Sequence, residues 1–282
     1  LSGLSFTGTI SGSGHSSVIE DNKIEGETGN GIEVTGNVTG SEIKILHNDN
    51  IKAGNNGIYL AGGEFAEETG EENARFTIDK NRVRKAENGA GIYVADTTLG
   101  GLDLDITRNS VWETGTDGIF VDTTSNTTID RNNIGYYGGG LTPVKKHKPY
   151  AKVIGDEGID VNNAPGVAIS NNHVTKTASN GISVNPSDFA EIIGNEVFGV
   201  AGDGINVVSG KGIRIDNNNV AAVLGHGIFT DGAYGLSVVN NDVLGTGQDG
   251  IHIVNAYGPD VFLSLQGFRG QGEGFNEESP SE

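Results

Sequence analysis

Short runs of alternating apolar and polar residues recur along the whole chain, and most of them begin directly after a glycine. Typical runs are Gly181-Ile-Ser-Val184 and Gly204-Ile-Asn-Val207. Alternation with a period of two over a few residues is typical of a β-strand with one buried face. No stretch of about ten residues has the 3.6-residue period of an amphipathic helix. The pattern therefore predicts an all-β protein.

These Gly-Ile strands are evenly spaced in the second half of the chain. From Gly158 to Gly250 the glycines of the motif recur at one constant interval of about 23 residues, whereas the earlier intervals are longer and uneven. Short strands at this spacing suit a coil in which each turn stacks on the previous one and the apolar side chains fill the interior. We expect one parallel β-helix domain of about ten coils over residues 1–270. The glycines of the motif are Gly31, Gly57, Gly91, Gly118, Gly158, Gly181, Gly204, Gly227 and Gly250.

An asparagine followed two residues later by an apolar side chain is the second repeated feature. A stacked column of buried amides at a bend would hydrogen-bond turn backbone that otherwise lacks partners, so we interpret these residues as a structural ladder rather than a polar site. We expect the repeated glycines to occupy turns that need a positive φ. The ladder comprises Asn22, Asn48, Asn81, Asn109, Asn132, Asn172, Asn195, Asn218 and Asn241.

Taken together, Asn-x-apolar followed by Gly-Ile-x-Val resembles the right-handed parallel β-helix repeat family, whose members include pectate-lyase-like solenoids. The resemblance covers roughly residues 17–268. It implies a right-handed β-solenoid in which residues 1–16 form a cap or a first partial coil and residues 271–282 form an acidic tail. The family includes polysaccharide lyases, hydrolases, epimerases, phage tailspikes, adhesins and filament proteins, so the fold alone does not determine a function.

Composition narrows the choice of partners. The chain has 18 Lys and Arg against 37 Asp and Glu, a formal net charge of −19. Such a charge disfavours nucleic acids and anionic membranes, and no apolar run approaches the length of a membrane span. Cysteine is absent, which excludes disulfides and thiolate ligands, and methionine is absent even at position 1. The missing cysteine leaves the redox compartment open. From the missing methionine we expect a mature or excised segment whose start has been removed. An extracellular or cell-surface location is expected only with the structural or adhesive function considered below.

Two insertions interrupt the repeat. The acidic one, Ala61–Ala74, is interpreted as a solvated loop. The other lies between Ile134 and Gly158 and is basic and aromatic, which suits an acidic polysaccharide or the acidic surface of a sister subunit; a merely solvated loop is the alternative. The residues of this insertion that we expect to bind a partner are Tyr136, Tyr137, Lys145, Lys146, Lys148, Tyr150 and Lys152.

The residues directly before the Gly-Ile motif form a column that includes Asp203, His226 and Asp249. Neighbouring coils are about 4.8 Å apart, so a histidine between two carboxylates could serve as a general acid or base. The alternative is turn chemistry, because Asp and Asn accept backbone N–H bonds in turns. A second column follows the isoleucine and contains Asp160 and His252, four coils apart and too distant to cooperate.

No complete catalytic pattern of the family is present. Mannuronan epimerases of this fold have a site resembling Tyr-Gly-x-Asp-Pro-His, and this chain has Tyr257-Gly-Pro-Asp260 without the Pro-His half. We therefore expect a structural or adhesive extracellular solenoid that self-assembles or binds glycans without catalysis. The alternative is a polysaccharide lyase or epimerase acting on an acidic glycan. No cofactor is required by either hypothesis, although aligned carboxylates would suit Ca²⁺.

Overall fold

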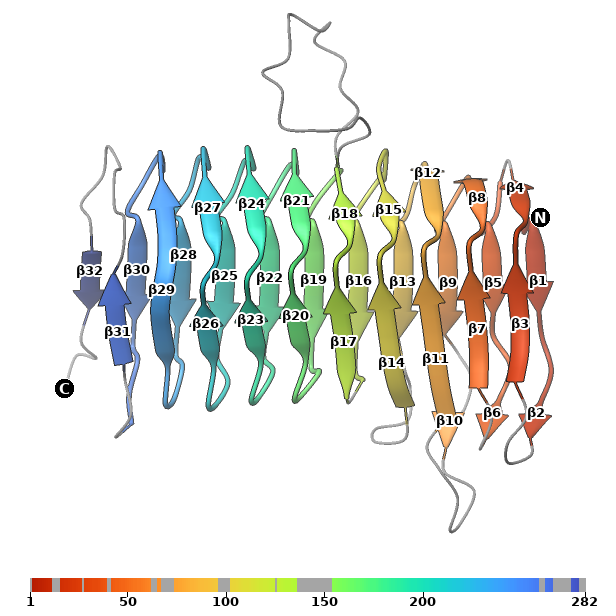
Figure 1. Cartoon of the computed structure of the whole chain (residues 1–282), viewed down its shortest axis with the longest axis horizontal. Coiled ribbons are helices and arrows are strands. Elements are labelled where there is room, and N and C mark those ends of the chain that lie inside the picture. The colour runs from red at the N-terminus through yellow and green to blue at the C-terminus, as the bar shows by residue number, and fades with distance from the viewer. Residues whose placement is uncertain are drawn as a thin grey trace, which may run out of the picture.

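The computed structural model describes residues 2–11, 16–26, 28–39, 42–61, 65–66, 74–95, 102–124, 126–135, 154–258, 262–265 and 275–278. The described residues form a single stack of parallel coils, with the first and last described strands, β1 (Leu4–Phe6) and β32 (Phe275–Glu278), at opposite ends of its long axis (Figure 1). Every pairing between named strands is parallel, and each strand pairs with its counterparts in the coils before and after it, so the predicted β-solenoid is confirmed.

Each coil contributes strands to three long sheets. Sheet 1 contains β1 (Leu4–Phe6), β5 (Ile32–Val34), β9 (Ile58–Ala61), β13 (Ile92–Ala95), β16 (Ile119–Asp122), β19 (Ile159–Asn162), β22 (Ile182–Asn185), β25 (Ile205–Val208), β28 (Ile228–Asp231), β30 (Ile251–Val254) and β32 (Phe275–Glu278). Its strands from β5 to β30 are the Gly-Ile runs of the repeat, and they pair isoleucine to isoleucine.

Sheets 2 and 3 are joined through one long strand, β29 (Ser237–Leu244). The other strands of sheet 2 are β3 (Ser16–Glu20), β7 (Glu42–Leu46), β11 (Ala74–Asp79), β14 (Leu102–Thr107), β17 (Thr127–Asp130), β20 (Ala168–Ser170), β23 (Glu191–Ile193), β26 (Arg214–Asp216) and β31 (Phe262–Leu265). Those of sheet 3 are β4 (Lys23–Glu25), β8 (Asp49–Ala53), β12 (Arg82–Ala86), β15 (Ser110–Val111), β18 (Asn133–Ile134), β21 (His173–Thr175), β24 (Glu196–Phe198) and β27 (Asn219–Ala221). A short fourth sheet pairs β2 (Ile10–Ser11), β6 (Val38–Thr39) and β10 (Phe65–Ala66).

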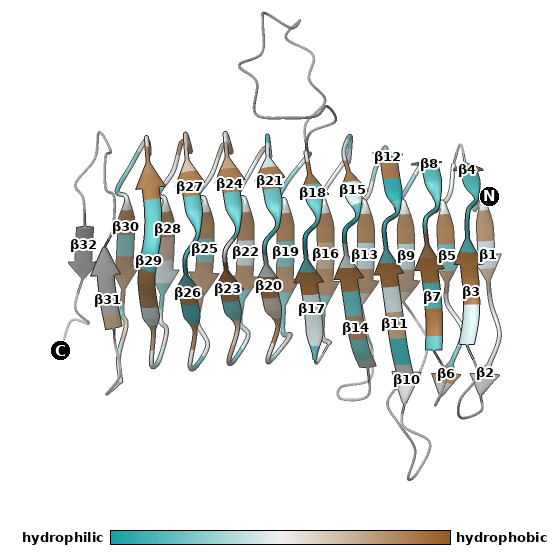
Figure 2. Ribbon diagram, in the orientation of Figure 1, coloured by the Kyte–Doolittle hydropathy of each residue, from teal (hydrophilic) through white to brown (hydrophobic). Residues whose placement is uncertain are grey.

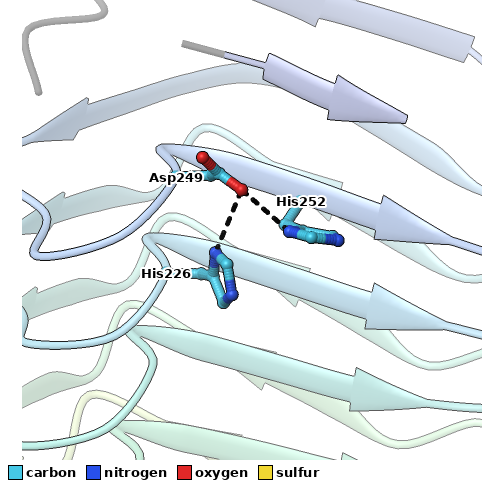
Figure 3. Close-up of side chains that lie close together, drawn as sticks. All are labelled: His226, Asp249 and His252. Carbon is cyan, nitrogen blue, oxygen red and sulfur yellow. Dashed lines mark hydrogen bonds and ion pairs between the residues drawn. The ribbon is translucent and has the colours of Figure 1, made fainter. Parts of the chain in front are cut away.

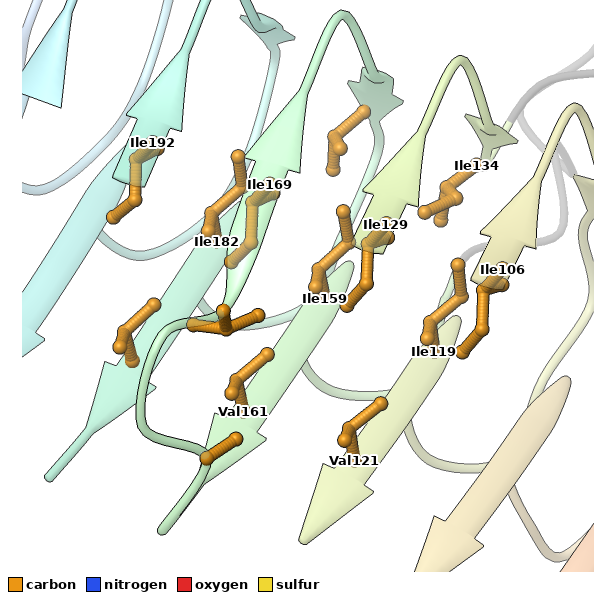
Figure 4. Close-up of a cluster of buried hydrophobic side chains, with 14 of the residues drawn as sticks. Ile106, Ile119, Val121, Ile129, Ile134, Ile159, Val161, Ile169, Ile182 and Ile192 are labelled. Carbon is orange, nitrogen blue, oxygen red and sulfur yellow. The ribbon is translucent and has the colours of Figure 1, made fainter. Parts of the chain in front are cut away.

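The core is a continuous column of aliphatic side chains inside the coil (Figure 4). Ile182, Ile205 and Ile228 lie in register on three successive strands of sheet 1 and have no exposed area. Colour bands of hydropathy repeat from coil to coil, most regularly between β20 and β30 (Figure 2). In β22, β25 and β28 the intervening residues point outward and are exposed to different degrees. Stacking of these coils therefore buries one face of each strand and leaves a regular outer face.

The asparagines form a hydrogen-bonded ladder at the bend between sheets 2 and 3. Asn195, for example, donates its Nδ2 to the Asn218 Oδ1 at 3.0 Å and to the Ile169 carbonyl at 2.9 Å, and its own Oδ1 accepts the Asn172 Nδ2 at 3.0 Å. Asn48 to Asn241 are buried, whereas Asn22 is exposed at the start of the ladder. The asparagine side chains thus provide hydrogen-bond partners for backbone groups of the bend that become buried when the coils stack.

Two local features differ from the sequence-based expectation. The apolar residue after each asparagine, such as Val174, belongs to a short strand of sheet 3, so each regular coil has three strands rather than two. The glycines of the Gly-Ile motif do not have a positive φ. A Cβ on Gly204 would lie 2.2 Å from a Val220 methyl and 2.5 Å from the Gly227 carbonyl, so glycine is required by close packing between coils. The left-handed conformation belongs instead to the residue before each ladder asparagine, such as Asn171 with φ 53°.

Candidate functional site

Two columns of side chains share the outer face of sheet 1. The turn column consists of the residue before each Gly-Ile motif, and the strand column consists of the residue after each isoleucine. Backbone hydrogen bonds between consecutive turns and the register of the strands hold both columns in line. The strand column contains Glu33, Tyr59, Tyr93, Phe120, Asp160, Ser183, Asn206, Phe229 and His252.

Much of the turn column performs turn chemistry. The Asn56 Oδ1 accepts the backbone N–H of Ala90 at 2.8 Å, and the Asn180 Oδ1 accepts that of Asp203 at 2.8 Å. Asp203 does the same for the next coil, because its Oδ1 accepts the His226 N–H at 2.6 Å, and its Oδ2 accepts the Asn206 side chain at 3.1 Å. The structure therefore places Asp203 against the backbone of His226 and not among the side chains that surround the imidazole ring.

Asp249 approaches the ring of His226 and also that of His252 (Figure 3). Its Oδ2 lies 2.8 Å from the His252 Nδ1 and 3.7 Å from the His226 Nδ1. The two imidazole rings have centroids 4.6 Å apart in an edge-to-face arrangement. We call His226, Asp249 and His252 the imidazole cluster. Sequence analysis placed His252 in a separate column, but the two columns are adjacent, and Asp249 and His252 belong to one coil.

A second cluster lies four coils away, and sequence analysis did not identify it. Carboxylate oxygens of Asp117, Asp156 and Glu157 lie within 4.8 Å of one another. They line a groove of about 480 Å³ together with Asp160, Tyr93, Phe120 and neighbouring polar residues. We call this region the carboxyl groove. Asp117 and Glu157 are consecutive members of the turn column, although 40 residues separate them.

Burial, together with the neighbouring carboxyl groups, raises the pKa values of three side chains in the groove. Burial, assisted by the charges of Asp160 and Asp156, raises the pKa of Asp117 to about 6. Burial and a hydrogen bond with Asp156 raise the pKa of Glu157 to about 7, against a smaller opposing effect of the Ser179 hydroxyl, which donates to Glu157 at 2.8 Å. Burial also raises the pKa of Asp160. The groove therefore retains protons near neutral pH, as general acids of enzymes do.

Aromatic rings continue the carboxyl groove along the strand column. The rings of Tyr59 and Tyr93 stack at 5.2 Å, and those of Tyr93 and Phe120 stack at 4.8 Å. All three side chains are partly exposed on the outer face of β9, β13 and β16. Flat rings beside oxygen acceptors form a surface with both apolar and hydrogen-bonding character. No Lys or Arg lines the carboxyl groove among the residues that the structure describes.

Other predicted contacts lie beyond the described ranges. The basic insertion is one of them, including Tyr136, Tyr137, Lys145, Lys146, Lys148, Tyr150 and Lys152. Asp260 of the partial epimerase pattern is another, whereas Tyr257 is exposed and packs edge-to-face on Tyr234. In the described ranges, no helix is long and apolar enough to cross a membrane.

The comparison with protein families decides the class of the fold. The model of the right-handed β-helix region matches residues 90–261, more than half of the chain. The chain belongs to the right-handed β-helix family. No curated protein matches it. The match covers the turns that carry both clusters, so the carboxyl groove and the imidazole cluster lie on the β-helix itself.

Several solved structures are similar to this chain. The periplasmic alginate epimerase AlgG has 14% sequence identity and a TM-score of 0.52, over 89% of this chain and 77% of that chain. The Dettilon tailspike protein has 16% identity and a TM-score of 0.48, over 97% and 61%. The A-module of mannuronan C-5 epimerase AlgE6 from Azotobacter vinelandii has 11% identity and a TM-score of 0.45, over 99% and 90%. At these identities the likeness is one of fold alone.

Proposed function

We propose that this β-helix is an extracellular glycan-binding protein that holds a polysaccharide along the outer face of sheet 1, over β9, β13, β16 and β19. The observation that carries the proposal is the stack of Tyr59, Tyr93 and Phe120 beside the carboxyl groove. Aromatic rings can pack on the apolar faces of sugar rings, while carboxyl and amide oxygens accept hydrogen bonds from sugar hydroxyl groups. An elongated face of equally spaced coils suits a chain ligand.

The charge of the groove favours a neutral glycan at this position. Four acidic residues line it without a cation from Lys or Arg among the described residues, so the lining offers no partner for the carboxylates of a uronic-acid chain. The acidic polysaccharide predicted from the basic insertion would need to bind at Lys145–Lys152 instead. The shared fold with a periplasmic enzyme of alginate supports a polysaccharide ligand and an extracytoplasmic location as parts of the proposal.

Tyr93→Ala tests the binding surface. Tyr93 contacts both of its aromatic neighbours, so we expect its removal to weaken binding of a neutral oligosaccharide at least tenfold by isothermal titration calorimetry. Tyr234→Ala is the matched control, because Tyr234 is also exposed and packs on another tyrosine, but lies outside the groove. Equal affinities of wild type and Tyr93→Ala for every glycan bound would contradict the proposal.

Glycoside hydrolysis is a second candidate, favoured by the raised pKa of Glu157. A carboxyl group that retains its proton near pH 7 can protonate a leaving glycosidic oxygen. A second carboxyl group in the groove, such as Asp160, would act as base or nucleophile in its ionised form. Lyase or epimerase chemistry would need a group that neutralises the substrate carboxylate, and the groove lining provides none among the described residues.

Product analysis distinguishes these functions. Hydrolysis releases reducing ends, which Glu157→Gln should abolish while leaving glycan binding measurable. A lyase gives unsaturated products with ultraviolet absorbance, and an epimerase changes the product NMR spectrum without cleavage. Binding without any of these products across neutral and acidic glycans assigns the groove to recognition alone.

A further inference from the structure

We infer that His226, Asp249 and His252 form a binding site for a divalent first-row transition-metal ion, for which Zn²⁺ is the probe. This inference goes beyond the proposed glycan surface and does not depend on it. One ring nitrogen of each histidine and one oxygen of Asp249 lie within 4.8 Å of one another. The three side chains come from β30, the turn before it and the turn before β28, so two adjacent coils supply the site (Figure 3).

The separations match those between ligands of one small ion. Two ligands that are each about 2.0–2.1 Å from Zn²⁺ in a tetrahedral arrangement lie about 3.3 Å apart. The Asp249 Oδ2 is 2.8 Å from the His252 Nδ1 and 3.7 Å from the His226 Nδ1, values on either side of that spacing. Changes of about half an ångström in side-chain position would bring both of these nitrogen–oxygen separations to the spacing expected around one ion.

One ring nitrogen of His226 has no hydrogen-bond partner among the described residues. This atom, Nδ1, is buried and faces Asp249 at 3.7 Å. Buried polar atoms are normally paired, and an imidazole nitrogen without a proton is a ligand for a metal ion. Metal binding through the His252 Nδ1 would place the proton of that ring on Nε2 and replace its present hydrogen bond to Asp249.

The surroundings hold the ligands in place. The backbone N–H of His226 is bonded to Asp203, and the parallel register fixes His252 beside Phe229 on the neighbouring strand. The Phe229 ring stacks on His226 with centroids 5.6 Å apart and also contacts the His252 ring at 5.6 Å. This apolar wall restricts the rotamers of both histidines and lowers water access on one side. Side chains that are already held in place and partly shielded from water favour metal binding, because they lose little conformational entropy when the ion binds.

The donor set selects the class of ion. Two imidazole nitrogens and one carboxylate oxygen suit Zn²⁺, Fe²⁺, Ni²⁺ or Cu²⁺, whereas Ca²⁺ and Mg²⁺ prefer oxygen ligands alone. About 15–18% of each ligand side chain is exposed, so the remaining coordination positions face the outer surface and are available to water or to a ligand hydroxyl. Three protein ligands with an open position are typical of a reactive metal site rather than a purely structural one.

Zinc titration of the untagged chain near pH 7.5 tests the inference. We expect isothermal titration calorimetry to give one site with micromolar or tighter affinity, and Co²⁺ to give visible absorption bands of a four- or five-coordinate ion. His252→Ala and Asp249→Asn should each weaken zinc binding at least tenfold. His173→Ala is the matched control, since the His173 Nδ1 lies 3.0 Å from Glu196 on sheet 3 but has no second histidine beside it among the described residues.

Folding and ligand assignment are checked on the same samples. Circular dichroism establishes that each metal-free variant is folded, and histidine-ring NMR spectra identify the nitrogens whose shifts move with zinc. No zinc binding by the folded wild type overturns the inference. Equal zinc affinity in wild type, His252→Ala and Asp249→Asn does so as well, as does a loss in His173→Ala as large as in His252→Ala. Glycan binding by Tyr93→Ala is a separate result and does not bear on these outcomes.

Discussion

The carboxyl groove and the imidazole cluster occupy equivalent positions on one face of the β-helix, yet their chemistry is opposite. Both combine the turn column with the strand column, and both place a phenylalanine, Phe120 or Phe229, one coil before a polar residue, Asp160 or His252. In the groove, burial and the nearness of other carboxyl groups raise the pKa values of Asp117 and Glu157. In the cluster, imidazole and carboxylate are complementary. The backbone fixes where side chains meet, and residue identity decides what they do.

The two regions also differ in the length of chain that separates equivalent positions on neighbouring coils. Along the regular coils that carry the imidazole cluster, equivalent positions such as Asp203 and His226 are 23 residues apart. The groove instead joins Asp117 to Glu157 across 40 residues. Ile119 and Ile159 nevertheless pair in the ordinary register, so the length of a connection does not alter the stacking. The register is fixed by the strands and by the residues on either side of the loop. About 19 Å separates Asp160 from His252 at the usual strand spacing.

Ile205→Asp should cause the largest loss in the free energy of unfolding. It should disrupt both regions, because they lie on the same stack of coils. Ile205 is fully buried between Ile182 and Ile228, on the coils that connect the groove to the cluster. An unpaired carboxylate there should lower the free energy of unfolding by at least about 4 kcal/mol. Thermal melts followed by circular dichroism measure this loss. Phe198→Asp, at an exposed position of β24, is the control, and a melting temperature of Ile205→Asp within a few degrees of wild type would refute the inward register.

Asn195→Ala should destabilise the asparagine ladder, which runs through the coils of both regions. Asn195 is buried, and truncation of its side chain removes the acceptor of the Asn172 backbone N–H and the donor to the Ile169 carbonyl. We expect the free energy of unfolding to fall by about 2 kcal/mol, as for an unsatisfied buried polar group. Urea denaturation gives the value. The same change at exposed Asn22 should cost less than half as much, and equal losses at the two positions would mean that burial of the ladder is unimportant.

The repeat made most of the fold predictable from sequence. A constant interval of 23 residues, as between Asn172, Asn195 and Asn218, aligns like residues in successive coils. The inward isoleucines and the asparagine column therefore follow from spacing alone. The separate strand around Val174 was not expected, because one apolar residue between two turns has no period of its own. The reason for glycine at Gly204 was also missed, since close packing against the next coil depends on the distance between coils and not on local sequence.

The sites were predictable only within a single column. Asp249 and His226 were placed together because they are vertical neighbours, but contacts between the turn column and the strand column, such as Asp249 with His252, depend on side-chain direction. The carboxyl groove was not predicted, because a long insertion separates Asp117 from Glu157 in the sequence. Gly118 and Gly158 are nevertheless consecutive glycines of the motif, which places the residues before them on neighbouring coils. Pairing acidic members of consecutive coils, whatever their separation in sequence, would have found it.

Glu157→Gln should change the pH dependence of stability in the groove. Because the folded pKa of Glu157 is raised from 4.5 to about 7, the folded state holds a proton that the unfolded chain releases. This group therefore stabilises the fold fully below about pH 4.5, and the contribution is lost as pH rises to about 7. Allowing for solvent screening of a half-exposed group, the loss between pH 5 and pH 8 is about 1–2 kcal/mol.

Urea denaturation at both pH values measures this difference. Glu157→Gln cannot titrate, so the wild type should lose more stability than the variant between pH 5 and pH 8. Glu191→Gln is the control, because Glu191 is exposed on sheet 2, outside the groove. The same change in stability with pH in Glu157→Gln and in wild type would show that Glu157 is already ionised at pH 5.

The smallest expected effect is a rise in melting temperature with calcium that depends on the carboxyl groove and not on the imidazole cluster. Carboxylate oxygens suit Ca²⁺, so the groove should respond to calcium and the imidazole cluster to zinc. At a calcium concentration equal to the dissociation constant, the stabilisation is about 0.4 kcal/mol, which corresponds to a rise of roughly 1–2 °C in Tm for a chain of this size. Asp156→Asn should remove this rise in melts at millimolar calcium, because Asp156 contributes an exposed carboxylate to the groove. His252→Ala should retain it. A calcium response that sodium chloride of equal ionic strength reproduces, or that survives in Asp156→Asn, would show that the ion only screens the net charge of −19 and has no site in the groove.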